Sequence, residues 1–346
     1  MGNGIAVSKL GFRFDQMNIL MIGDPSGNDD ECMKKMGCQL STSLGAIPKT
    51  NVWFAGVKEV LVNPKAFGTP EIIHYIAGPS WRSFVFTRLL KMRTGSKGTK
   101  TVVSFIHPQW SYLASLAFRL LIPDVAVVQS FRWKVYCSHL NLRIWDRPIV
   151  GVDLERFRPV APIEKQRIRN EFKFPKNKKV ALHVGHLNRG RNLLFMENLV
   201  KMDLLPVVIG STAVQADDEL IRSLETAGVI VIHEYIENIE KYYQAADCYV
   251  FPTIDPRSCS QIPMSIVEAM SCGLPVVSTR FEGLPLFFPD GYPGITYVDD
   301  LDILSEKVHE ALSISAKPEP EKLTCFDWRN IAVELRDLYV EILRNE

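Results

Sequence analysis

The sequence lacks any uninterrupted apolar stretch long enough to cross a membrane. Its longest apolar run extends from Thr101 to Val128. Four residues interrupt this run: His107, Pro108, Arg119 and Pro123. A membrane-spanning helix needs about 20 consecutive apolar residues, so this interrupted run is not expected to form one. Residues 1–16 also lack a continuous apolar core, so we expect no signal peptide and interpret them as an extension before the fold.

The chain also has little net charge and no ordered pattern of metal-binding residues. Its 40 Lys and Arg residues nearly balance 39 Asp and Glu residues, which gives a formal net charge of +1 and indicates no general attraction to nucleic acid. The 7 cysteines form no Cys-x-x-Cys pair. We therefore predict buried, reduced thiols, a cytoplasmic protein and no bound metal. A length of 346 residues is sufficient for two domains.

The most informative stretch extends from Ser258 to Val277. Small polar residues precede Pro263, which favours a helix start because proline has no N–H group to lose at the first helical position. Apolar residues then recur at helical spacing. Gly273 and Pro275 are typical of a helix end. The stretch therefore predicts a short helix bounded by Pro263 and Gly273.

Two apolar runs flank this predicted helix, at Cys248–Pro252 and Val276–Thr279. They indicate a strand, loop, helix, strand unit with parallel strands, and such units bind ligands at the carboxyl ends of their strands. The start of the helix offers unpaired N–H groups, which suit a phosphate. Glu268, within the helix, can accept hydrogen bonds from the two hydroxyls of a ribose. The alternative is a solvated helix residue, which is the usual state of an isolated Glu.

The first half of the chain alternates apolar runs with helical patterns. Expected strands are Met17–Gly23, Val52–Ala55, Val60–Val62, Thr101–Ile106 and Val125–Val128. A turn follows the first of these strands, and a helix then extends to about Leu44. We interpret Lys34 and Lys35 on this helix as surface charges. A second helix is expected between Pro108 and Leu121. His107 ends an expected strand, where it would open onto a cleft.

Strand patterns begin again after a turn-rich segment at Gly151–Pro159. The expected strands are Val180–Gly185, Leu205–Ser211 and Val229–His233. The expected helices are Leu193–Met202, Asp217–Ala227 and Ile239–Ala246. A last helix is expected to extend to Arg344, with Asp327 as its cap. The loop between Gly185 and Leu193 carries Arg191, which can bind phosphate oxygens in pairs; the alternative is a surface charge. The fold class is therefore α/β, with two doubly wound domains.

A basic segment with interleaved aromatic residues lies between Phe84 and Lys100. Such a segment can lie on an anionic membrane. A helix that faces the core, followed by a solvated basic loop, explains the same pattern. Both interpretations stay open at this stage.

Glu268 to Thr279 reads Glu-Ala-Met-Ser-Cys-Gly-Leu-Pro-Val-Val-Ser-Thr, between a Phe-Pro-Thr strand end and a Glu-Gly-Leu-Pro string that starts at Glu282. A Gly-Val-Asp string at Gly151 leads to Phe157-Arg158-Pro159. Together these motifs resemble the nucleotide-sugar-binding region of the group 1 (family 4) retaining glycosyltransferases. The resemblance covers most of the chain and is most specific from Gly151 to Leu284.

The resemblance implies the GT-B architecture, in which two Rossmann-like domains face each other across a cleft. By this comparison residues 17–150 form the acceptor-side domain, 151–323 the nucleotide-sugar domain, and 324–346 a helix that packs back on the first domain. The implied activity is that of a retaining hexosyltransferase, which moves a hexose-type sugar from a nucleotide-diphosphate sugar to a glycan, lipid or small-molecule hydroxyl. The family mechanism needs neither a protein nucleophile nor a metal, in keeping with a sequence that has no paired-carboxylate or Ser-His-Asp signature.

The resemblance also assigns site residues. It places His107 beside the donor sugar. It implies that His186 and Arg191 bind the diphosphate and that Glu268 binds the ribose. Ser260 stands where the family usually has a sugar-facing Glu, eight positions before Glu268. Further donor contacts fall on a set of loop residues: Gly27, Gly185, Arg189, Tyr235, Ile236, Gln261, Ile262 and Pro263.

Two alternative functions stay open. One is another GT-B enzyme, either a nucleotide-sugar epimerase or a sugar phosphorylase. The other is a catalytically silent subunit that binds a nucleotide sugar, which the missing carboxylate at Ser260 favours. For the implied transferase we expect a nucleotide-sugar donor and no nucleic acid, with a location in the cytoplasm or at the cytoplasmic face of a membrane.

Overall fold

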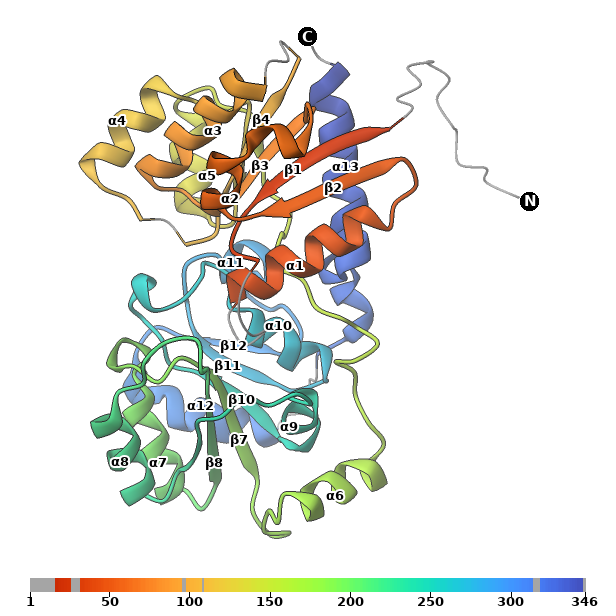
Figure 1. Cartoon of the computed structure of the whole chain (residues 1–346). Helices are drawn as coiled ribbons and strands as arrows, with labels where there is room; N and C mark the ends of the chain where they lie inside the picture. Colours follow the sequence, from red (N-terminus) through yellow and green to blue (C-terminus); the bar gives the residue numbers. More distant parts are fainter. Residues whose placement is uncertain (1–15, 26–31, 95–97, 108, 314–317, 345–346) are drawn as a thin grey trace.

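The structure is a computed structural model that describes residues 16–25, 32–94, 98–107, 109–313 and 318–344. It contains two parallel six-stranded sheets, one in each half of the chain (Figure 1), with strand orders β2-β1-β3-β4-β5-β6 and β12-β11-β10-β7-β8-β9. Helices cover both faces of each sheet. The predicted α/β class with two doubly wound sheets is confirmed.

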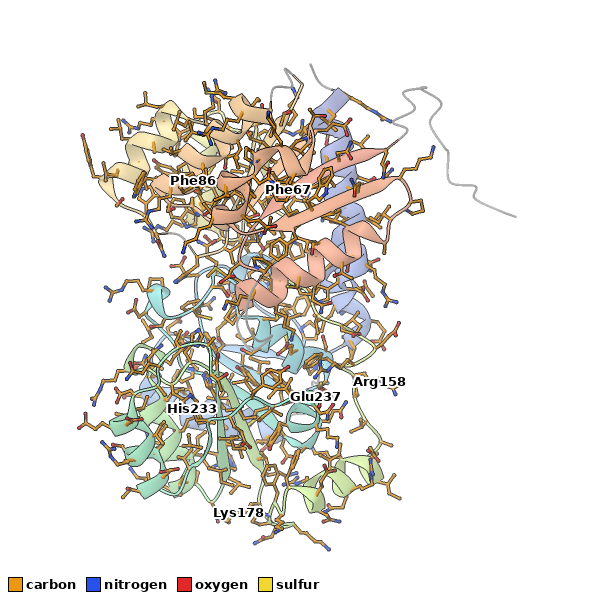
Figure 2. All side chains as sticks on the ribbon, in the orientation of Figure 1. Phe67, Phe86, Arg158, Lys178, His233 and Glu237 are labelled. Atoms are coloured by element: carbon orange, nitrogen blue, oxygen red, sulfur yellow. The ribbon has the colours of Figure 1, made fainter. Side chains whose placement is uncertain are left out.

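The first sheet is built from the strands that the apolar runs predict, with two additional ones. Its strands are β1 (Met17–Ile22), β2 (Thr50–Ala55), β3 (Ile72–Gly78), β4 (Lys100–Phe105), β5 (Val125–Val128) and β6 (Ile144–Trp145). Its helices are α1 (Cys32–Gly45), α2 (Val57–Val62), α3 (Trp81–Thr94), α4 (Tyr112–Leu120) and α5 (Phe131–Ser138), with a 3₁₀ turn, η1 (Pro64–Phe67). Helix α1 packs on one face of the sheet, whereas α3, α4 and α5 pack on the other. Figure 2 shows side chains filling this domain, with the buried Phe67 among them.

The predicted strand at Val60–Val62 is wrong, because these residues end helix α2. Val60 is buried against the sheet, but Val62 is 85% exposed. As part of a helix, Val60 is buried in the core cluster of the first domain, and this packing overrides the intrinsic strand preference of the segment.

The second sheet follows the predicted alternation closely. Its strands are β7 (Val180–Gly185), β8 (Leu205–Gly210), β9 (Ile230–Ile232), β10 (Cys248–Phe251), β11 (Val276–Thr279) and β12 (Ile295–Val298). Its helices are α6 (Pro162–Glu171), α7 (Met196–Lys201), α8 (Asp218–Thr226), α9 (Glu240–Ala245), α10 (Met264–Ser271), α11 (Leu284–Phe287) and α12 (Leu304–Ser313). Short 3₁₀ turns connect several of them: η2 (Arg189–Arg191), η3 (Leu193–Phe195), η4 (Pro256–Ser258), η5 (Leu301–Ile303) and η6 (Pro320–Phe326). The helix expected at Leu193–Met202 is therefore divided between η3 and α7.

The chain crosses from one sheet to the other near Val152 and returns through the last helix, α13 (Trp328–Arg344). Val152 N donates to Phe326 O at 2.8 Å. As predicted, Asp327 caps α13, since its Oδ1 accepts from Arg329 N at 2.8 Å. Figure 1 shows α13 alongside the first sheet.

A buried polar contact joins α13 to the first domain. Tyr339 OH lies 2.6 Å from His74 Nδ1, and His74 Nε2 lies 2.6 Å from Ser104 Oγ. Burial lowers the pKa of His74 to about 3, so the imidazole is neutral at physiological pH. A neutral ring can donate from one nitrogen and accept at the other, which matches two hydroxyl partners.

All seven cysteines are free thiols, but only Cys137, Cys248 and Cys272 are buried. The prediction of buried thiols is wrong for the others, and Cys325 is exposed. No helix within the described ranges combines the length and the apolar character that crossing a membrane requires.

Candidate functional site

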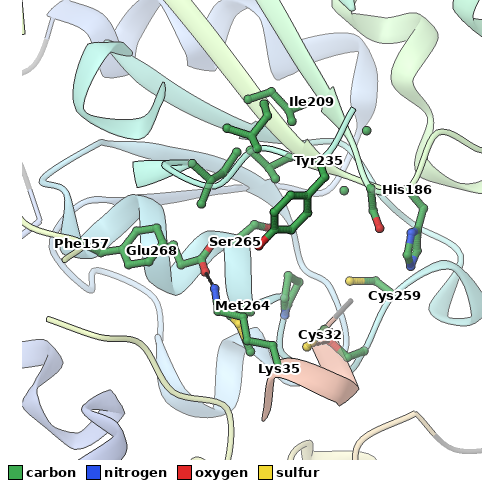
Figure 3. Close-up of a pocket in the computed structure, with 18 of the residues that line it drawn as sticks. Cys32, Lys35, Phe157, His186, Ile209, Tyr235, Cys259, Met264, Ser265 and Glu268 are labelled. Carbon is green, nitrogen blue, oxygen red and sulfur yellow. Dashed lines mark hydrogen bonds and ion pairs between the residues drawn. The ribbon is translucent and has the colours of Figure 1, made fainter. Parts of the chain in front are cut away.

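A deep pocket lies between the two domains, with walls from both (Figure 3). The second domain contributes the carboxyl ends of β7 and β8, the loop before α9 and the start of α10. The first domain contributes α1 through Cys32, Lys35 and Gln39. The space between these walls, about 1210 Å³, includes open solvent, so a ligand can enter the pocket from outside.

The start of α10 forms one wall of this pocket. Pro263 precedes the helix in an extended conformation (φ −65°, ψ 115°), and no side chain caps the helix. Pro263 is thus the residue before the first helical position, one earlier than its predicted place. Pro263, Met264 and Ser265 line the pocket, so the uncapped N–H groups of the first turn lie at its wall. Such a helix start attracts an anion.

Glu268 lies one turn further along α10, and it is not solvated. It is only 5% exposed, and it accepts from Lys35 Nζ at 2.6 Å and from Tyr243 OH at 2.8 Å. Burial, followed by the charge of Glu268, raises the pKa of Tyr243 well above its usual value, so Tyr243 remains a hydroxyl donor. Figure 3 shows Lys35 reaching Glu268 from α1. The interpretation of Glu268 as a solvated residue, and of Lys35 as a surface charge, is wrong.

Arg191 is 4% exposed and lines the pocket, so it is not a surface charge. Its Nε donates to Ser258 O at 2.8 Å, which holds the guanidinium beside the end of β7. There, a Cβ on Gly185 would lie 2.6 Å from Arg191 Nη1. Only glycine at position 185 leaves room for this guanidinium. His186, the next residue, also lines the pocket.

A second histidine, His183, lies beneath Arg191 within β7. It is fully buried, and its Nδ1 lies 2.8 Å from Val250 O. Burial, with a smaller effect from the nearby Arg191 charge, lowers the pKa of His183 to about 3. A neutral imidazole adds no positive charge next to Arg191, so the pocket's cationic character here comes from the guanidinium.

Ser260 lines the pocket and is largely buried. Its Oγ donates to Ile262 O at 2.9 Å and lies 3.5 Å from Cys32 Sγ of the first domain. Ser260 does not cap α10, because the residue before the helix is Pro263 and no side chain caps it. Ser260 instead lies where the two domains meet at the pocket.

Other predicted residues take different places. Tyr235 and Ile236 line the pocket from the loop before α9. Arg189 does not line it, because its guanidinium is bound by Asp217 at 3.0 Å and by Glu219. Gly27 lies outside the described residues.

Gln261, Ile262 and His107 lie beside the pocket and do not form its wall. The N–H of Gln261 donates to Ile106 O at 2.9 Å, which joins the α10 loop to the end of β4. His107 follows Ile106 directly and its N–H donates to Gly78 O at 3.3 Å. Ile262 is buried in the hydrophobic core. Gln261 therefore contributes to the contact between the domains, and His107 follows the β4-end residue that Gln261 contacts.

Sequence reasoning missed Lys35, Cys32, Phe157 and Ser265 as pocket residues. Lys35 Nζ also lies 5.2 Å from the centre of the Phe157 ring. The position of α1 directly after the first strand was a usable signal, because helices that follow parallel strands begin at the ligand-binding edge. Within the described residues no group of three or more His, Cys, Asp or Glu side chains could hold a metal ion.

Residues 178–313 match the family model described as "Glycosyl transferases group 1". The chain is 27% identical over 251 residues to the sulfoquinovosyl transferase SQD2 of Arabidopsis thaliana, covering 67% of this chain and 47% of that protein. It is also 27% identical over 218 residues to the D-inositol 3-phosphate glycosyltransferase of Corynebacterium jeikeium (strain K411), covering 56% of this chain and 50% of the relative. The chain thus spans about half the length of these two relatives.

Solved structures share the fold over nearly the whole chain. A glycosyltransferase from Rickettsia africae ESF-5 superimposes with a TM-score of 0.74 at 15% identity, over 96% of this chain and 100% of that chain. Anabaena HepE in complex with UDP gives a TM-score of 0.69 at 14% identity, over 94% and 100%. Its complex with UDP-glucose gives 0.69 at 13% identity, over the same shares. At these identities the similarity establishes the fold.

Proposed function

Because residues 178–313 match the family model of the group 1 glycosyltransferases and the chain shares its fold with solved glycosyltransferases, we propose that it is a group 1 enzyme of the GT-B type and a retaining hexosyltransferase. It would transfer a hexose-type sugar from a nucleotide-diphosphate sugar to an acceptor hydroxyl. The observation that carries the proposal is a single pocket that holds a buried carboxylate, a buried guanidinium and an uncapped helix start.

These groups suit the successive parts of one donor molecule. The diphosphate would lie at the start of α10, between His186 and Arg191, where N–H groups and a guanidinium meet its charge. The ribose hydroxyls would donate to Glu268, and the base would lie against Tyr235 and Ile236. The complexes of the structural neighbour HepE with UDP and UDP-glucose support this type of donor.

The proposed catalysis rests on charge stabilisation and positioning. As the bond from the sugar to the diphosphate breaks, negative charge grows on the leaving phosphate beside Arg191 and the α10 start. That phosphate would take the proton of the acceptor hydroxyl on the same face of the sugar, which retains its configuration. The proposal therefore uses neither a protein nucleophile nor a metal. His107 lies beside the pocket, and the proposal requires closure of the domains to bring it to the sugar.

Lys35 competes with the ribose in this proposal, because it already occupies a Glu268 oxygen at 2.6 Å. We expect Lys35→Met to tighten UDP binding by about 1–2 kcal/mol, since the ribose no longer has to displace a charge-assisted hydrogen bond. Isothermal titration calorimetry measures the change. Lys34→Met is the matched control, because Lys34 pairs with Asp24 at 3.6 Å and does not line the pocket. Weaker UDP binding by Lys35→Met would show instead that Lys35 contacts the donor.

Ser260 is expected to influence the sugar and not the nucleotide. We expect Ser260→Ala to change turnover and the preference between two UDP-hexoses, while UDP affinity stays within error. Loss of the hydrogen bond to Ile262 O should lower stability by only about 0.5–1.5 kcal/mol. Steady-state kinetics and a thermal melt on the same protein provide both measurements. Unchanged kinetics with a lower melting temperature would leave Ser260 a structural residue.

Donor hydrolysis distinguishes the enzyme from a silent binding subunit. The protein is incubated with UDP-glucose without an acceptor, and release of UDP is measured against an Arg191→Met variant. Slow release that depends on Arg191 supports an enzyme. Tight binding of UDP-glucose with no release, with or without candidate acceptor alcohols, would contradict the proposed activity.

A further inference from the structure

Positive charge is concentrated in one part of the chain. Residues 72–145, from the start of β3 to the end of β6, contain 10 Lys or Arg residues and 1 Asp, a formal net charge of 10 − 1 = +9. Since the whole chain has a net charge of +1, the remaining residues sum to −8. The near-neutral total therefore conceals a strongly basic block within the first domain.

Helix α4, within this block, has an apolar face directed to solvent. Tyr112, Leu113, Leu116 and Leu120 are exposed, by 82%, 57%, 45% and 72% respectively. At 100° per residue these four side chains fall on one stripe of the helix. The opposite face buries Ala114 and Phe118. A helix on the surface of a soluble domain ordinarily directs its polar face outward, so α4 has the reverse pattern.

The neighbouring helices extend this apolar surface. On α3, Trp81, Leu89 and Met92 are exposed, and on α5 Phe131 and Val135 are exposed. Phe84, Phe118 and Trp133 pack these three helices on the same face of the sheet. Figure 1 shows α3, α4 and α5 together at one side of the first domain, away from α13, and Figure 2 places the half-buried Phe86 on that side. We call this surface the α3–α5 face.

Exposed arginines lie on the same three helices, namely Arg82, Arg88, Arg93, Arg119 and Arg132. Within the described residues, none of the five has an ion-pair partner. The acid of this block, Asp124, is already bound to Lys91 at 3.2 Å and to Thr101. The α3–α5 face therefore presents guanidinium groups whose charge no carboxylate of this domain balances.

We propose that the α3–α5 face docks on the surface of an anionic lipid bilayer. The leucines of α4, with Trp81 and Met92, would enter the boundary between headgroups and acyl chains, while the arginines would contact lipid phosphates. Charge complementarity selects this occupant. A symmetric dimer through this face would place two basic surfaces against each other, which is repulsive.

Flotation with lipid vesicles, without nucleotide, tests the proposal. The wild-type protein is expected to float with phosphatidylcholine vesicles that contain phosphatidylglycerol, to float poorly with phosphatidylcholine alone, and to lose binding as salt is raised. Removing two cations by Arg88→Gln with Arg119→Gln should lower the partition constant about thirtyfold, on the basis of about 1 kcal/mol for each cation. Removing two apolar groups by Leu113→Gln with Leu120→Gln should lower it about tenfold or more.

Matched controls come from the second domain. Ile163 is 82% exposed on α6, and Arg222 is exposed on α8. The double variant Ile163→Gln with Arg222→Gln therefore removes one exposed apolar group and one exposed cation outside the α3–α5 face. It should bind vesicles as the wild type does. Equal flotation with neutral and anionic vesicles, or wild-type binding by the α4 variant, would overturn the proposal. So would a dimer in lipid-free sedimentation that the α4 variant dissociates. Because no nucleotide is present, none of these outcomes bears on the proposed glycosyl transfer.

Discussion

Replacing Glu268 with Gln is expected to weaken UDP binding by about 1.5–3 kcal/mol, the scale of hydrogen bonds to a charged group. The change keeps the size of the side chain but removes the carboxylate charge that the ribose hydroxyls would use. Isothermal titration calorimetry with UDP provides the measurement. A thermal melt accompanies it, because Glu268 also accepts from Tyr243 at 2.8 Å and its loss leaves Lys35 without its counter-charge.

Two comparisons make this result specific to the ribose. The affinity of 2′,3′-dideoxy-UDP should hardly change on Glu268→Gln, because that ligand lacks both hydroxyls. The double variant Lys35→Met with Glu268→Gln removes both partners of the ion pair, and should bind UDP about as weakly as Glu268→Gln alone. Wild-type affinity of Glu268→Gln for UDP would exclude Glu268 from the nucleotide site and overturn the proposed placement of the donor.

Replacing Arg191 with Met is the second change with a large expected effect. It should weaken UDP binding by about 1.5–3 kcal/mol, while the affinity for uridine, which carries no phosphate, stays unchanged. The side chain is buried and lies beside the end of β7, so its guanidinium acts where water is largely excluded. Equal losses for UDP and uridine would contradict a role in binding the diphosphate.

Gly185 provides an independent probe of the same guanidinium. A Cβ at this position would lie 2.6 Å from Arg191 Nη1, so Gly185→Ala should displace the guanidinium and weaken UDP binding, while uridine binding is retained. Gly45→Ala is the matched control, because its Cβ would meet nothing within 4 Å. Wild-type affinity of Gly185→Ala for UDP would show that binding of the diphosphate does not depend on the position of the Arg191 guanidinium.

The sequence alone determined most of the architecture of the second domain. Short apolar runs with a glycine or proline at one end or directly beside it predicted β7, β8, β10 and β11, because strands buried on both faces leave a continuous apolar pattern. The helix between Pro263 and Gly273 was predicted for a similar reason, since proline and glycine restrict the backbone locally. Gly273 indeed has a positive φ of 76°. Such features depend on neighbours in the chain, so a sequence displays them directly.

Only the tertiary structure decided which side chains share the pocket. Lys35 and Glu268 are 233 positions apart, and nothing in the local pattern of either residue indicates an ion pair. Arg189 and Arg191 occupy the same loop, but only Arg191 lines the pocket. The guanidinium of Arg189 is bound instead by Asp217 and Glu219. The sequence predicted a helix between Pro108 and Leu121, but not that an apolar face of α4 is exposed. The exposure of this face depends on how many helices cover one face of the sheet. The periodicity of a helix in the sequence shows which of its faces is apolar, but not what packs against that face.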